Sequence, residues 1–139
     1  MDPMLIMFGK LLLAAFLGVV MGTERSVIAR QQAGMRTYAL VSLGACVFIL
    51  GAASISATSL DVAQGIVQGV GFIGAGLIFM RGESVHGITT AAGLWVSASV
   101  GVLVAFGLYA LAIFASALTL SIFFGLWFVE QYFKKLHDS

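Results

Sequence analysis

Charged residues are scarce in this sequence. Asp, Glu, Lys and Arg together make up 9% of the 139 residues, whereas hydrophobic residues make up 60%. A soluble domain usually gives about a quarter of its positions to those four charged types, so most of this surface is suited to lipid rather than water. The formal net charge of +1 also excludes the Lys- and Arg-rich face that binds nucleic acid.

Cysteine and catalytic motifs are almost as scarce. Cys46 is the single cysteine and lies inside an apolar run, so the chain has neither a disulfide framework nor a cysteine-based metal site. We interpret Cys46 as a packing residue. The sequence also has no Walker-type phosphate loop, nucleophile elbow or paired His and Cys ligands. We therefore expect neither enzymatic activity nor a bound cofactor.

Long apolar runs occupy most of the chain. A helix rises about 1.5 Å per residue and needs about 20 apolar residues to cross the hydrocarbon core. The runs therefore predict an all-α integral membrane protein, a single transmembrane domain over residues 1–139 built as a bundle of about five helices. The expected spans are residues 4–22, 38–57, 62–80, 90–106 and 108–128, with Gly107 as the turn between the last two. The first span has an acidic start and no small-residue cleavage site, so we expect it to be retained.

The few cations predict the orientation of these spans. The cations near the ends of spans one, three and five are Arg25, Arg30, Arg36, Arg81, Lys134 and Lys135. The connections at the opposite side contain no Lys or Arg. The positive-inside rule therefore predicts an N-terminus outside and a C-terminus in the cytoplasm.

Small residues recur four positions apart in the predicted spans. The series are Gly18 and Gly22; Gly65 and Gly69; Gly93, Ser97 and Gly101; and Ala117, Ser121 and Gly125. Lipid tails give one apolar helix little reason to prefer another, so such spacing favours close backbone contact. The contacts belong either to one compact bundle or to a homodimer seam, and the spacing does not decide between them.

Arginines surround two predicted helix N-termini on the cytoplasmic face. Helix N-termini offer unpaired N–H groups and a positive dipole end, which together with arginine can hold an anion or an acidic lipid headgroup. The predicted site consists of Arg25, Arg36, Arg81, Thr37 and Thr90, with the two threonines also capping their helices. The alternative is that these arginines only determine topology.

Five further polar residues are candidates for ionic or pathway contacts. Glu24 and Glu83 have the oxygen ligands that Mg²⁺ prefers, but we expect ion pairs such as Glu24 with Arg81 or Glu83 with Arg36. Lys10 is either an anchor that reaches the outer interface or a contact to a partner or pathway. Gln64 and Gln68, one turn apart, predict interhelical hydrogen bonds.

Two blocks of the sequence resemble a known family. The runs Gly22-Thr23-Glu24-Arg25, Ala33-Gly34-Met35-Arg36-Thr37 and Leu40-Val41-Ser42-Leu43-Gly44-Ala45 form the first block. Gly71-Phe72-Ile73-Gly74-Ala75-Gly76, then Val85-His86-Gly87-Ile88-Thr89-Thr90-Ala91-Ala92 and Trp95, form the second. Both resemble the MgtC/SapB family of bacterial membrane proteins, over roughly residues 18–109. The chain departs from it at Ser26, where many members have an acid, and we expect it to be a short member without the soluble C-terminal domain of longer members.

The resemblance implies a bacterial inner-membrane protein associated with adaptation to low magnesium, acid or intracellular stress. For the MgtC branch it implies modulation of other membrane complexes, including the ATP synthase, rather than magnesium transport. Two functions follow. The first is a regulator that binds a membrane protein partner or lipids. The second is a small homo-oligomeric transporter or channel, with Mg²⁺ as one candidate ion and Lys10, Gln64 and Gln68 along its path.

Overall fold

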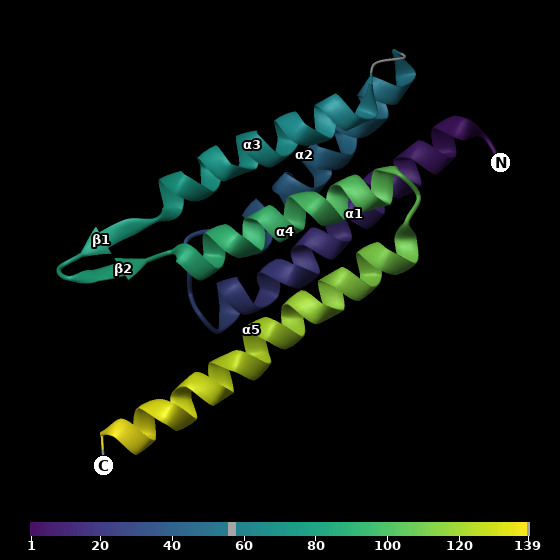
Figure 1. Ribbon diagram of the computed structural model, residues 1–139. Coiled ribbons are helices and arrows are strands. Elements are labelled where there is room, and N and C mark those ends of the chain that lie inside the picture. The colour runs from purple at the N-terminus through teal and green to yellow at the C-terminus, as the bar shows by residue number, and fades with distance from the viewer. Residues whose placement is uncertain (56–57, 139) are drawn as a thin grey trace.

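Helices make up nearly the whole chain in the computed structural model, which describes residues 1–55 and 58–138. The helices are α1 (Pro3–Val27), α2 (Met35–Ser54), α3 (Ser59–Leu77), α4 (Ile88–Ala105) and α5 (Tyr109–His137). A short antiparallel hairpin, β1 (Phe79–Arg81) with β2 (Ser84–His86), joins α3 to α4 (Figure 1). All five helices are long and apolar enough to cross a membrane. The predicted all-α class is confirmed, with five helices of the length and hydropathy that a membrane span needs.

The helix boundaries differ from the predicted spans mainly at their ends. α1 continues past residue 22 to Val27, because Glu24 and Arg25 are buried against other helices and need not lie in a loop. α3 ends at Leu77 rather than 80, and the hairpin takes up the residues that follow. α5 runs to His137 rather than 128, since its last residues include good helix formers that extend a helix beyond the apolar run. The predicted end of the second span, residue 57, lies outside the described residues.

The caps of α2 and α4 are glycines, and the predicted threonine caps are wrong. Gly34 and Gly87 occupy the N-cap positions, which leaves Thr37 and Thr90 inside the first turns. Gly87 has a left-handed φ of 89°, and a Cβ there would overlap the carbonyl oxygen of Leu77. The turn from the hairpin into α4 therefore requires glycine.

Helix α4 lies at the centre of the bundle and packs against the other four helices (Figure 1). Its closest approach is to α2, because a Cβ added to Gly101 would overlap the carbonyl oxygen of Ser42. α1 approaches α2 in the same way at Gly18 and Gly22. Two of the four predicted small-residue series therefore hold one bundle together, as the spacing allowed.

The other two small-residue series make no close helix contact within this bundle. A Cβ at Gly65 or Gly69 would meet nothing within 4 Å, and Ala117, Ser121 and Gly125 are exposed along α5. These residues form no contact that would explain their spacing within one chain. A seam with another helix therefore stays a prediction for α3 and α5.

The two ends of the bundle differ in charge. The α1–α2 link, the β1–β2 hairpin and the C-terminus lie together at one end, which we call the basic end (Figure 1). The N-terminus, the end of α2, the start of α3 and the α4–α5 turn lie at the other end (Figure 1). Lys10 lies toward this second end, where its Nζ donates a hydrogen bond of 2.7 Å to the carbonyl oxygen of Ala105. The partner of Lys10 is therefore in the same chain, at the C-terminus of α4, where the helix dipole favours a cation.

Candidate functional site

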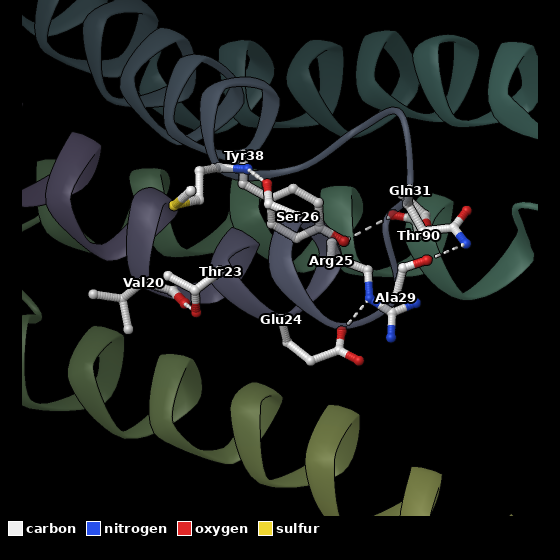
Figure 2. A network of polar contacts seen from close by, with 10 residues as sticks. Val20, Thr23, Glu24, Arg25, Ser26, Ala29, Gln31, Tyr38 and Thr90 are labelled. Carbon is white, nitrogen blue, oxygen red and sulfur yellow. Dashed lines mark hydrogen bonds and ion pairs between the residues drawn. The ribbon is translucent and has the colours of Figure 1, made fainter.

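A buried polar cluster lies near the basic end, between α1, α2, α4 and α5. Glu24 and Arg25 are consecutive residues of α1, and their side chains form an ion pair (Figure 2). Glu24 is 1% exposed and Arg25 is 7% exposed. The Arg25 Cζ also lies 4.5 Å from the ring centroid of Phe123 on α5, a cation–π contact. This pair connects the end of α1 to α5.

Tyr38 ties α2 to the central helix. Its hydroxyl donates to the carbonyl oxygen of Thr90 at 3.1 Å (Figure 2). Its own carbonyl oxygen accepts from the Ser97 Oγ at 2.8 Å. The ring meets Phe123 edge to face, with 6.5 Å between centroids. Tyr38 and Thr90 are therefore part of the packing between helices and are not open to a ligand.

The five residues of the predicted anion site do not come together. Arg25 and Thr90 are buried in the polar cluster, and Arg81 is exposed on β1. The expected ion pairs are also wrong: Glu24 pairs with Arg25, and within the described residues no ion pair joins Glu83 to Arg36. The sequence did not indicate this pair, because the first span was expected to end before Glu24 and Arg25, whereas α1 continues to Val27 and buries both.

Arg36 and Thr37 line a polar pocket beside the start of α2. The pocket has a volume of about 580 Å³. Its other lining residues are Ser26, Gln31, Gln32, Gly34, Met35 and Leu40, so the lining includes one cation and no acid. The Met35 N–H donates to the Ser26 Oγ at 2.8 Å. Among the described residues, the backbone N–H groups of Arg36 and Thr37 have no backbone acceptor, as expected for the first turn of a helix.

An apolar groove runs between α2 and α3 and meets this pocket. The groove has a volume of about 780 Å³ and shares Thr37 and Leu40 with the pocket. α2 contributes Gly44 and Phe48 to it, and α3 contributes Gly65, Gly69 and Ile73. We call the groove and pocket together the α2–α3 site. Sequence reasoning missed it, although the glycines that leave it open were visible in the sequence.

Gln64 and Gln68 lie on the exposed face of α3. Within residues 1–55 and 58–138, neither side chain forms a hydrogen bond to another residue. The predicted interhelical bonds are therefore not formed within one chain. Contact with a second chain stays a prediction for this face.

The donor types at the α2–α3 site are suited to an anion rather than a cation. A guanidinium, side-chain amides and backbone N–H groups are the ordinary partners of phosphate and carboxylate. Among the described residues, no three His, Cys, Asp or Glu side chains gather where they could hold a metal ion.

Five membrane-length helices, four of them packed around α4, define a polytopic α-helical membrane protein with an accessible groove on its side. The chain belongs to the MgtC family, whose sequence model matches residues 11–132. It is 44% identical to Protein MgtC of Salmonella typhimurium strain LT2 over 124 residues, covering 86% of this chain and 53% of that protein. It is 37% identical over 121 residues to the Escherichia coli K12 protein named "Putative magnesium transporter YhiD", covering 80% of this chain and 56% of the relative.

A third relative is Protein MgtC of Brucella abortus strain 2308, which is 42% identical over 111 residues, 78% of this chain and 46% of that protein. The chain therefore spans about half the length of the curated relatives it matches. No solved structure matches the chain.

Proposed function

We propose that this chain is a non-catalytic regulator in the bacterial inner membrane that acts by binding membrane protein partners or lipids. Its link to magnesium is supported by the family membership and by the name of the YhiD relative, and its link to acid stress is what the family resemblance implies. The observation that carries the proposal is the α2–α3 site, which opens on the side of the bundle, whereas Arg25, Tyr38 and Ser97 are engaged in helix packing. A site on the side of the bundle faces the membrane plane, where a lipid or a membrane protein partner can reach it.

The proposed orientation places the N-terminus outside and the basic end in the cytoplasm, since positive loops are retained there. We expect a membrane-impermeant maleimide to label Leu108→Cys in intact cells, and to label Gln31→Cys only after permeabilisation. Both positions are exposed, and both variants are made in a Cys46→Ala background because Cys46 is the native thiol. The reverse labelling pattern would contradict the orientation.

The second candidate function is a small oligomeric transporter or channel. It is favoured by Gln64 and Gln68, two exposed amides on a helix of membrane length. An amide facing hydrocarbon without a partner costs about 1–3 kcal/mol by mutational measures, so this face is better satisfied by a second chain or by a wet path. In that case the path would lie between subunits.

Ion flux separates the two functions. If the chain is a regulator, proteoliposomes that contain it take up Mg²⁺ no faster than protein-free vesicles, and a cross-linker captures a membrane complex in cells. Saturable Mg²⁺ uptake that Gln64→Leu/Gln68→Leu abolishes, and that the exposed control Gln131→Leu leaves unchanged, would instead establish transport. Uptake is measured with an internal Mg²⁺-sensitive dye.

A further inference from the structure

The two parts of the α2–α3 site differ in polarity in the way that the two parts of a lipid do. The apolar groove runs along α2 from Leu40 to Phe48, a rise of about 12 Å for eight helical residues. The polar pocket adjoins the Leu40 end, with Arg36 and the glutamines of the α1–α2 link around it. The surface is thus amphiphilic along the direction of the helix axis.

We propose that the α2–α3 site binds one anionic phospholipid, with an acyl chain in the groove and the phosphate in the pocket. The proposal deepens the proposed function and rests on it, because it names a ligand for lateral binding. The groove is open because Gly44, Gly65 and Gly69 have no side chain and their Cβ positions meet nothing within 4 Å. A flexible chain can therefore lie against both helices.

The charge at the pocket determines which headgroup it takes. Arg36 supplies a guanidinium, which binds phosphate through paired hydrogen bonds. The backbone N–H groups of Arg36 and Thr37 add donors at the same place. Because no acid lines the pocket, a net negative headgroup is preferred over a zwitterionic one.

A transmembrane helix from a partner fits this surface less well than a lipid does. The partner would have to place an anionic group beside Arg36, at the end of its own apolar stretch. Every anionic phospholipid has its phosphate directly at the end of its acyl chains. That phosphate lies at the membrane surface, where the basic end is expected. We therefore assign the site to lipid, and binding of a partner helix is the competing outcome of the test.

The test compares lipid retention by native mass spectrometry on the full chain in detergent with added phosphatidylglycerol or phosphatidylcholine. We expect one retained phosphatidylglycerol per chain. Gly69→Ile, which fills the groove, lowers retention about tenfold, whereas Gly71→Ile, two residues along the same helix and also in open space, leaves it unchanged. Arg36→Gln lowers the preference for phosphatidylglycerol about fivefold, and the loss of the exposed Arg81 in Arg81→Gln leaves the preference unchanged.

Equal lipid retention by the Gly69→Ile and Gly71→Ile variants overturns the proposal, whether or not a protein partner is lost. Loss of a co-purifying protein from Gly69→Ile alone, with lipid retention intact, would assign the groove to that partner and overturn the lipid assignment while leaving the regulatory function standing. Magnesium uptake in proteoliposomes tests only the regulatory function and not the lipid assignment. The two proposals can therefore be contradicted independently. Gel filtration of each variant is the control for folding.

Discussion

Arg25→Gln should lower the stability of the bundle by about 3–5 kcal/mol, because it removes one partner of a buried ion pair and leaves the other uncompensated. Glu24 is 1% exposed and its Oε1 already has no hydrogen-bond partner in the described residues. The substitution also removes the contact between Arg25 and the Phe123 ring. The measurement is the fraction of monodisperse protein left after heating in detergent.

A double substitution tests whether the ion pair is the cause. Glu24→Gln/Arg25→Gln removes both charges, so it should recover about 1–3 kcal/mol relative to the sum of the single losses. Arg36→Gln is the control, since Arg36 is an exposed arginine at the same end and its loss should change stability by less than about 0.5 kcal/mol. Strictly additive losses at Glu24 and Arg25 would mean that the pair is not coupled.

This prediction separates two arginines that the sequence presents as equivalent. Both lie near the ends of apolar runs, so charge patterning assigns them the same role in topology and anion binding. Burial distinguishes them: Arg25 holds α1 to α5, whereas Arg36 lines a pocket. The difference is visible only in the three-dimensional packing. α1 extends about one turn beyond its apolar run, and this extra turn buries Arg25 between helices.

The sequence predicts the spans well because the membrane constrains them strongly. Length and hydropathy alone determine where a helix can cross, and the four-residue spacing of Gly18 with Gly22 correctly indicated close contact. The hairpin Phe79–His86 was missed, since its apolar residues continue the run of α3. The groove could not be predicted either, because it depends on how far α2 and α3 lie apart and not on either helix alone.

Gly101→Ala should destabilise the bundle by about 3 kcal/mol or more, at the upper end of the range for overpacking. The new Cβ would overlap the carbonyl oxygen of Ser42 and also press on Ala45. The first of these is a backbone atom, so α2 and α4 must move apart. Because α4 packs against all four other helices, we expect a large loss of monodisperse protein after heating.

The matched control is the same glycine-to-alanine change at a position where it should raise stability. Gly125→Ala lies in α5, where a Cβ meets nothing within 4 Å, and alanine favours a helix over glycine by about 1 kcal/mol. The same chemical change should therefore stabilise one site slightly and strongly destabilise the other. Equal effects at both positions would show that helix propensity, rather than the contact between α2 and α4, determines the outcome, and the close approach of these helices would then not hold the bundle together.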